Sequence, residues 1–184
     1  MQRVRVDRRR IIFETLAIAL LIVLIIIDQL TKLHFSTTLK MYERVPVIDG
    51  FFYFTYTTNT GGGFSLLANK PWAQTFFKIL TSISLVLFVA LYVYSSKKGY
   101  KWLRFALIFV ISGTVGNFID RLLMNHVIDF ISLVFWEYHF PVFNIADCCL
   151  VVGVIMVIIH FLFLDNSAIF KKKDENEQIS DNNE

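Results

Sequence analysis

Long apolar runs separated by short polar connections dominate this chain of 184 residues. Four of the runs, residues 11–33, 72–95, 102–123 and 142–164, are each close to the roughly 20 residues that a helix needs to cross a bilayer. The first run follows an arginine-rich start, but it ends in IIIDQLTK rather than in a small-residue cleavage site. The pattern therefore predicts four retained membrane-spanning helices.

The connection between the first two runs has a different pattern. Asp49-Gly50 separates two stretches rich in aromatic and β-branched residues, which is a common hairpin signal. Aromatic residues occupy both odd and even positions of residues 51–56, and such rings concentrate at the membrane interface. We therefore expect an all-α membrane protein with a small extracytoplasmic β-sheet at about residues 45–66.

Composition and charge agree with a membrane protein and orient it. The chain is 55% hydrophobic and 16% aromatic, more apolar surface than one small soluble core can hide. Basic residues cluster in residues 1–10, 97–104 and 171–173, which four spans place on one face. The positive-inside rule makes that face cytoplasmic and puts residues 34–71 and 124–141 outside. We expect one integral membrane domain over residues 1–170 and a disordered cytoplasmic tail over residues 171–184.

Polar residues that are rare at membrane depth gather near the outer ends of the predicted spans or between them. They are Asp28, Lys32, Asn117, Asp120, Arg121, Asp129, Asn144 and Asp147. A carboxylate at the bilayer centre costs about 2.5–3.5 kcal/mol on insertion scales, so such residues usually have a function. Their convergence on one leaflet predicts a site there.

Each of these residues also has a purely structural interpretation. Asp28 and Lys32 have the spacing of an interfacial ion pair, which contributes little when exposed. Arg121 has the position of an arginine that extends to lipid headgroups. Asparagines such as Asn117 and Asn144 can hydrogen-bond neighbouring helices. Four carboxylates, two asparagines and an arginine together exceed what packing alone requires.

Two of the carboxylates, Asp129 and Asp147, come from different segments and can face each other. Two carboxyl groups held close do not both ionise cheaply, so one keeps a proton while the other acts as a base. Such a pair can hydrolyse an amide by general acid–base catalysis. Asp120 is an alternative partner for Asp147, but Arg121 and Lys32 are expected nearby as cations that keep it ionised. No G-x-S-x-G or HExxH motif is present.

Five motifs then stand in a characteristic order. DQLTK (28–32), NTGGGFS (59–65), SGTVGNFIDR (112–121), VIDF (127–130) and FNIAD (143–147) resemble the signature blocks of lipoprotein signal peptidase, also called signal peptidase II. The chain departs from the family pattern at two places, where one small residue stands for another. Ser112-Gly113 stands where the family usually has a double glycine before Gly-Asn, and Gly62-Gly63 stand at the usual small residues after Asn-x-Gly. The resemblance implies a multi-pass aspartic endopeptidase of the bacterial cytoplasmic membrane. Such an enzyme removes the signal peptide of diacylglyceryl-modified prolipoproteins just before the lipidated cysteine.

The same resemblance assigns roles to residues of this chain. It makes Asp129 and Asp147 the catalytic dyad. Residues expected to hold the substrate backbone or orient the dyad are Asn59, Gly61, Asn117, Arg121 and Asn144, and those expected to support the site are Asp28, Lys32 and Asp120. The connection between the third and fourth spans, residues 124–141, is expected to contribute a flexible covering segment. The resemblance also implies contacts with prolipoproteins, membrane lipids and globomycin-type inhibitors, a monomer, and no metal, organic cofactor or nucleic acid.

Two other classes of function compete with a peptidase. Intramembrane carboxylates also mark the ion paths of channels and transporters. However, the inner halves of the spans are nearly all apolar apart from Arg104 and His160. A non-catalytic membrane scaffold would explain the aromatic hairpin but would leave Asp129 and Asp147 without a role.

Overall fold

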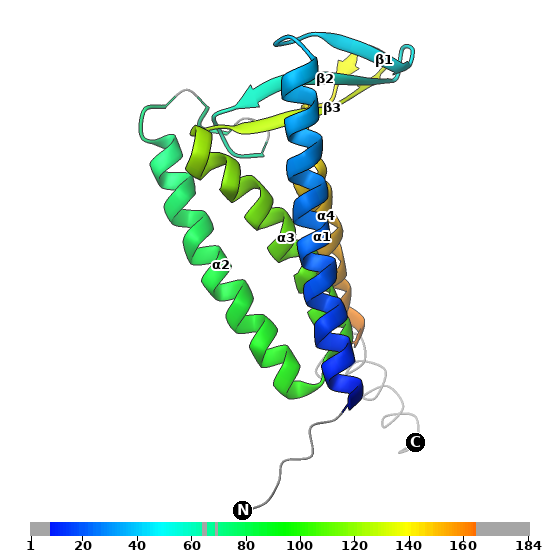
Figure 1. Cartoon of the computed structure of the whole chain (residues 1–184), viewed down its shortest axis with the longest axis vertical. Helices are drawn as coiled ribbons and strands as arrows, with labels where there is room; N and C mark the ends of the chain where they lie inside the picture. Colours follow the sequence, from blue (N-terminus) through cyan, green and yellow to red (C-terminus); the bar gives the residue numbers. More distant parts are fainter. Residues whose placement is uncertain (1–7, 64–65, 69, 165–184) are drawn as a thin grey trace, which may run out of the picture.

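Four long helices form a bundle, and a small antiparallel sheet covers one end of it (Figure 1). The structure is a computed structural model that describes residues 8–63, 66–68 and 70–164. The helices are α1 (Arg8–Thr38), α2 (Ala73–Lys98), α3 (Lys101–Met124) and α4 (Ile145–Ile159), which continues as a short π-helical segment, η2 (His160–Leu164). Each is long and apolar enough to cross a membrane, so the four predicted spans are confirmed. The predicted tail over residues 171–184 lies outside the described residues.

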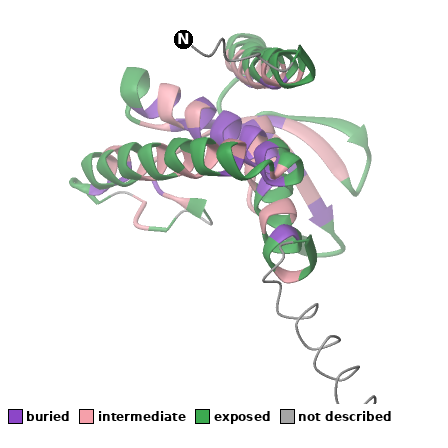
Figure 2. Cartoon of the chain, turned by 90° about the horizontal axis from the view of Figure 1, so that it is seen from below, coloured by how far each residue is buried: buried purple, intermediate pink, exposed green. Residues whose placement is uncertain are grey.

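Helix α3 is the centre of the bundle, and α1, α2 and α4 all pack against it. In α3, 67% of the most apolar window is buried, compared with at most 17% in each of the other helices. Viewed from below in Figure 2, buried residues gather in the middle of the molecule, and the outer helix surfaces are exposed. Those exposed surfaces are rich in leucine, isoleucine and valine. Apolar residues on the outside of an apolar bundle are explained by lipid as the surrounding solvent.

Glycines let α3 and α4 approach closely. A Cβ atom added at Gly113 would lie 2.3 Å from the carbonyl oxygen of Ala146, and one at Gly153 would lie 2.7 Å from the backbone nitrogen of Val110. Small residues at helix crossings are the usual way in which membrane helices maximise packing contacts. The close crossing brings the first turn of α4 beside the middle of α3.

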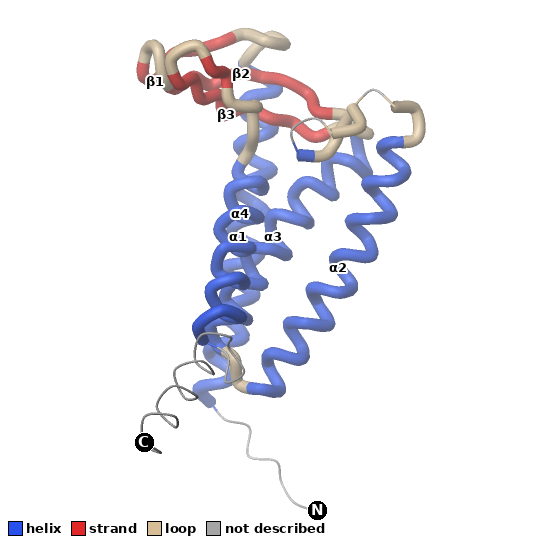
Figure 3. The backbone as a smooth tube through the Cα atoms, turned by 180° about the vertical axis from the view of Figure 1, so that it is seen from behind, coloured by secondary structure: helices blue, strands red, loops and turns tan. Residues whose placement is uncertain are grey.

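Both outer connections contribute to the sheet. Its strands are β1 (Arg44–Ile48), β2 (Phe52–Asn59), β3 (Val127–Phe135) and β4 (Tyr138–His139), in the spatial order β1-β2-β3-β4 (Figure 3). The predicted hairpin turn is confirmed, with Gly50 at a φ of 75° that favours glycine. The expectation of a flexible covering segment is wrong for residues 127–135. This apolar, β-branched stretch pairs with β2 along most of its length.

A polar cluster ties α1, α2 and α3 together at the end opposite the sheet. The guanidinium of buried Arg104 pairs with the Glu14 carboxylate, which also accepts hydrogen bonds from Tyr92 and Ser96. The same guanidinium lies 4.3 Å from the ring centroid of Phe13. Arg104 is thus a helix-packing residue, which weakens its interpretation as part of an ion path.

Candidate active site

The first turn of α4 places Asp147, and its cap explains the sequence FNIAD. Asn144 is the N-cap of α4, and its Oδ1 accepts a hydrogen bond from the backbone nitrogen of Asp147 at 3.0 Å. In return, Oδ2 of Asp147 accepts from the backbone nitrogen of Asn144 at 3.2 Å. This reciprocal capping box satisfies backbone donors at a helix start. It also limits the orientations that the Asp147 carboxylate can adopt.

Asn144 links Asp147 to the second predicted catalytic residue. Its Nδ2 donates to Oδ1 of Asp129 at 2.6 Å and to Oδ1 of Asn117 at 3.1 Å. Asn117 in turn donates from Nδ2 to Oδ1 of Asp147 at 2.8 Å. Two asparagines from α3 and the α4 cap therefore connect a carboxylate on β3 with one on α4. The predicted convergence of these four residues is present in the structure.

The Asp129 carboxyl lies in a buried position on β3, opposite Thr57 of β2. Burial is the main cause that raises the pKa of Asp129 from 3.8 to about 7, and the charge of Asp147 raises it further. Hydrogen bonds from Asn144 and Asn59, together with the charge of Lys32, oppose this rise. Near neutral pH, Asp129 is therefore suited to carry a proton.

Lys32 is the buried cation near Asp129 and Asp147. Its Nζ lies 2.8 Å from Oδ2 of Asp28 and 2.9 Å from Oδ2 of Asp120, and it donates to Oδ1 of Asn117 at 3.1 Å. Lys32, Asp28 and Asp120 are each at most 2% exposed. The interpretation as an exposed interfacial ion pair is therefore wrong. A buried lysine with two carboxylates and an amide needs all of these partners, because unpaired buried charges are costly.

Asp120, the alternative dyad partner, is engaged elsewhere. In addition to Lys32, its carboxylate accepts hydrogen bonds from Nε2 of Gln29 at 3.0 Å and from the backbone nitrogen of Ile128 at 3.2 Å. The latter bond anchors the start of β3, which leads directly to Asp129. Of Lys32 and Arg121, the two cations expected near Asp120, Lys32 forms the ion pair with it. This geometry favours a supporting role for Asp120.

Asp28, a buried residue of α1, holds the start of α4 in place. Its Oδ1 accepts a hydrogen bond from the backbone nitrogen of Ala146 at 2.8 Å, which satisfies a further donor of the first turn. Gly116 leaves room for this carboxylate, because a Cβ atom there would lie 2.5 Å from Oδ2 of Asp28. Gln29, which sequence reasoning missed, bonds Asp28, Asp120 and the carbonyl of Gly116. Its place inside DQLTK, beside Asp28, was the available signal.

The segment after β2 closes another side of the site. Nη2 of Arg121 donates to the carbonyl of Gly61 at 3.1 Å, and Nη1 donates to the carbonyl of Asn117 at 3.3 Å. The backbone nitrogen of Gly61 donates to Oδ1 of Asn59 at 2.8 Å. Arg121 is only 9% exposed, so it does not extend to lipid headgroups as one interpretation held.

Among the described residues, no group of three or more His, Cys, Asp or Glu could hold a metal ion.

Comparisons with known proteins agree with this site. Residues 20–163 match the sequence model of a family described as signal peptidase (SPase) II. The chain is 40% identical over 76% of its length to a lipoprotein signal peptidase of Bacillus velezensis, covering 89% of that protein. It is 39% identical over 86% of its length to one of Bacillus subtilis, covering 96% of it, and 37% identical over 87% to one of Pseudomonas fluorescens, covering 90%.

Solved structures give the same result. A structure described as a bacterial membrane enzyme superposes with a TM-score of 0.71 at 36% identity, covering 80% of this chain and 88% of the other. A second one has a TM-score of 0.69 at 36% identity, covering 82% of this chain and 95% of the other. Four membrane-type helices, a four-stranded sheet and these matches lead to one conclusion. The chain belongs to the signal peptidase II family of membrane peptidases.

Proposed function

We propose that this protein is an aspartic endopeptidase that removes signal peptides from diacylglyceryl-modified bacterial prolipoproteins, cutting just before the lipidated cysteine. The observation that carries the proposal is the hydrogen-bonded link from Asp129 through Asn144 and Asn117 to Asp147. Relatives named lipoprotein signal peptidases support the choice of substrate class. The aspartic mechanism rests on the geometry of the two carboxyl groups.

In the proposed reaction Asp129 carries the proton and Asp147 is the base. Both oxygens of Asp147 accept hydrogen bonds, from Asn117 and from the backbone of Asn144, and it lies at the positive end of α4. Asp147 takes a proton from water as the water oxygen attacks the scissile carbonyl carbon, while Asp129 protonates the carbonyl oxygen. Asp147 then gives its proton to the departing amine as the C–N bond of the tetrahedral intermediate breaks. One hydroxyl of that intermediate returns its proton to Asp129, which leaves a carboxylic acid.

The surrounding residues take supporting roles in this proposal. Asn117 and Asn144 orient the carboxyl groups, and Asn59, Gly61 and Arg121 border the space for the substrate backbone. Lys32 with Asp28 and Asp120 holds α1, α3 and the start of α4 in register. Asp129 is buried and Asp147 is half-buried, so the dyad acts where electrostatic interactions are stronger than in bulk water. We also propose a monomer that needs neither metal nor organic cofactor and that globomycin-type inhibitors would block.

The charge distribution supports an outward-facing site in the cytoplasmic membrane. Lys97, Lys98 and Lys101 join α2 and α3 at the end opposite the sheet, and Arg8–Arg10 begin α1 at that same end (Figure 1). The positive-inside rule makes this end cytoplasmic. The dyad then lies at the extracytoplasmic boundary, where a lipid-anchored cysteine presents its peptide bond.

The test is cleavage of a purified diacylglyceryl-modified prolipoprotein, with a chelator present, by wild type and by Asp129→Asn and Asp147→Asn. Each substitution is expected to lower kcat by about 10²–10⁴-fold, the usual contribution of a general acid or base. Glu137→Gln, which changes an exposed carboxylate in the β3–β4 turn, is the matched control and should cleave normally. Near-normal cleavage by both aspartate variants would remove the dyad from the mechanism.

A further inference from the structure

The loop of residues 59–63, which follows β2, is held by the start of α2. Nε2 of Gln74, in the first turn of α2, donates a hydrogen bond to the backbone carbonyl of Thr60. One turn later, the ring of Phe77 packs against Gly62, where an added Cβ atom would lie 2.9 Å from the ring. Two successive turns of one helix therefore set the path of this loop.

The loop reaches the proposed dyad through Asn59. Oδ1 of Asn59 accepts a hydrogen bond from the backbone nitrogen of Gly61 at 2.8 Å, and its Nδ2 donates to the carbonyl of Gly62 at 3.4 Å. The same side chain donates a hydrogen bond to the Asp129 carboxyl. An asparagine that bonds the backbone two residues on is oriented by that backbone. A shift of the loop therefore changes the contact between Asn59 and Asp129.

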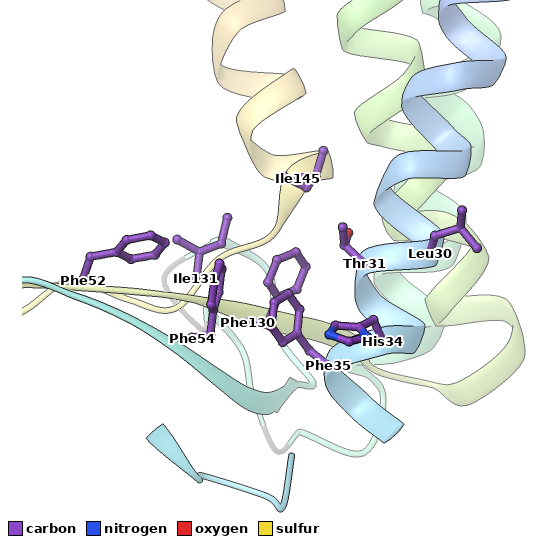
Figure 4. Close-up of a pocket in the computed structure, with 9 residues that line it drawn as sticks. All are labelled: Leu30, Thr31, His34, Phe35, Phe52, Phe54, Phe130, Ile131 and Ile145. Atoms are coloured by element: carbon purple, nitrogen blue, oxygen red, sulfur yellow. The ribbon is translucent and has the colours of Figure 1, made fainter. Parts of the chain in front are cut away.

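The strand that carries Asp129 has a separate anchor. Phe130, the next residue of β3, lies in an apolar groove between α1, the sheet and the start of α4 (Figure 4). Its ring stacks on that of Phe35 at a centroid distance of 4.6 Å. The residues that line this groove do not include Asp129. The groove thus fixes β3 by packing, whereas the Asp129 carboxyl takes its side-chain hydrogen bonds from Asn144 and Asn59.

The contact from Gln74 is not explained by the stability of α2. A polar side chain at a helix start can satisfy free backbone nitrogens, but within the described part of the chain no side chain caps α2 at Trp72. Gln74 instead reaches Thr60, 14 residues earlier. Its buried Oε1 has no hydrogen-bond partner among the described residues, which is a cost to folding. The amide therefore serves the loop rather than its own helix.

We propose that Gln74 is a positioning residue for the proposed reaction: its hydrogen bond to Thr60 holds the loop so that Asn59 donates to Asp129. The proposal rests on the proposed function and deepens it. It adds a residue of α2, a helix that contributes none of the site residues expected from the motifs. Gln74 lies outside all five motifs, so only the packing of α2 against the loop reveals its part.

The expected consequence is a change in how Asp129 holds its proton. The hydrogen bond from Asn59 favours the ionised carboxyl, so its loss raises the pKa of Asp129. Because Asp129 carries the proton in the proposed reaction, the decline of kcat at high pH would move to higher pH. The other charged groups that act on Asp129 are Asp147 of α4, Lys32 of α1 and Arg121 of α3. A change at Gln74 leaves all of them in place, and β2 and the loop carry no acidic or basic residue.

The kinetic test compares the pH profile of prolipoprotein cleavage by wild type and by Gln74→Met, which keeps the side-chain length but has no N–H donor. Gln74→Met should lower the plateau value of kcat about tenfold, as small misplacements of reacting groups do. The decline of kcat should begin at a higher pH than in wild type. The Tm should stay near that of wild type, because the unpartnered Oε1 is removed as well.

Thr75→Met, on the exposed side of the same turn, is the matched control and should behave as wild type. An unchanged kcat in Gln74→Met would overturn the proposal. So would a lowered kcat with an unmoved decline, because Gln74 would then act by a route that does not include Asp129.

A double variant tests the route through Asn59. Asn59→Ala should move the decline of kcat in the same direction as Gln74→Met. Gln74→Met added to Asn59→Ala should move it no further, since the two residues act in series. Additive shifts would overturn the proposal.

An infrared titration of the Asp129 carboxyl does not depend on cleavage, with the band assigned by its loss in Asp129→Asn. The titration midpoint should be higher in Gln74→Met than in wild type, and equal midpoints would overturn the proposal. A higher midpoint in a protein that cleaves no prolipoprotein would support the hold of Gln74 on Asp129 and reject the proposed function.

Discussion

At the scale of single residues, the site depends on side chains that perform several tasks at once. Asn144 caps α4, orients Asp129 and contacts Asn117, using both its amide oxygen and its amide nitrogen. An aspartate could serve the cap but would add a third carboxyl group beside the dyad. A serine could also serve the cap but lacks the amide that donates to Asp129. This combination of tasks accounts for an amide at the start of so apolar a helix.

The raised pKa of Asp129 predicts a pH-dependent stability. Below its ordinary pKa of 3.8, the carboxyl is protonated in both folded and unfolded chains, so its burial carries no ionisation penalty. As the pH rises to about 7, the unfolded chain loses this proton while the folded chain keeps it. The free energy of unfolding therefore falls across this window, by a total of a few kcal/mol, about 1.36 kcal/mol per unit of pKa difference.

Asp129→Asn should remove this contribution. Measured by thermal unfolding in detergent, its Tm relative to wild type is expected to increase steadily from pH 4 to pH 7 and then to level off. Parallel Tm curves for the two proteins over the whole range would show that the Asp129 carboxyl is not buried in the way described.

At the scale of elements, one lysine joins parts of the chain that are far apart in sequence. Lys32 on α1 pairs with Asp28 one turn earlier and with Asp120 on α3, and Asp28 also bonds the first turn of α4. The close α3–α4 crossing at Gly113 and Gly116 makes these contacts short enough. The ion network and the small residues thus act together to set the position of Asp147.

Lys32→Met should destabilise the protein strongly, because it leaves two buried carboxylates without their cation. Loss of one partner from a buried ion pair costs about 3–5 kcal/mol. Lys78→Met is a matched control, since half-buried Lys78 donates a hydrogen bond to Asn125 and forms no ion pair among the described residues, and its effect should remain within about 0.5 kcal/mol. Denaturant unfolding of both variants provides the comparison. Equal small effects would mean that Lys32 is dispensable for folding.

At the scale of the whole molecule, the helix bundle and the sheet have different structural roles. The helices bring the carboxylates and asparagines of the site together, and the sheet covers that end of the bundle (Figure 3). The clustered basic residues Arg8–Arg10, Lys97, Lys98 and Lys101 stand at the opposite end of the bundle. This polarity predicts that the sheet faces away from the cytoplasm.

Thiol labelling in intact cells tests the orientation, starting from a variant in which Cys148 and Cys149 are replaced by serine. A membrane-impermeant thiol reagent should modify Glu137→Cys, in the exposed β3–β4 turn, without lysis. It should modify Lys98→Cys, at the end of α2, only after lysis. The reverse pattern would invert the topology and move the site to the cytoplasmic side.

The amino-acid sequence by itself determined the four spans, the hairpin at Asp49-Gly50 and the set of polar residues near one leaflet. Apolar length, helical period and turn chemistry are local properties, so they can be read without knowing what packs against them. The motif order identified the family for the same reason, because motifs are stretches of neighbouring residues. Those local signals were sufficient to select Asp129 and Asp147 as the candidate dyad.

Only the tertiary structure decided how these residues meet. Pairing of β2 with β3 joins Thr57 to Asp129, and no local pattern specified that partner or made residues 127–135 a strand of the same sheet. The burial of Lys32, the part played by Gln29 and the groove beside Phe130 likewise depend on how far each helix is rotated and how closely it packs. Such contacts join residues about 70 or more positions apart, and packing of complementary surfaces, rather than local propensity, selects them.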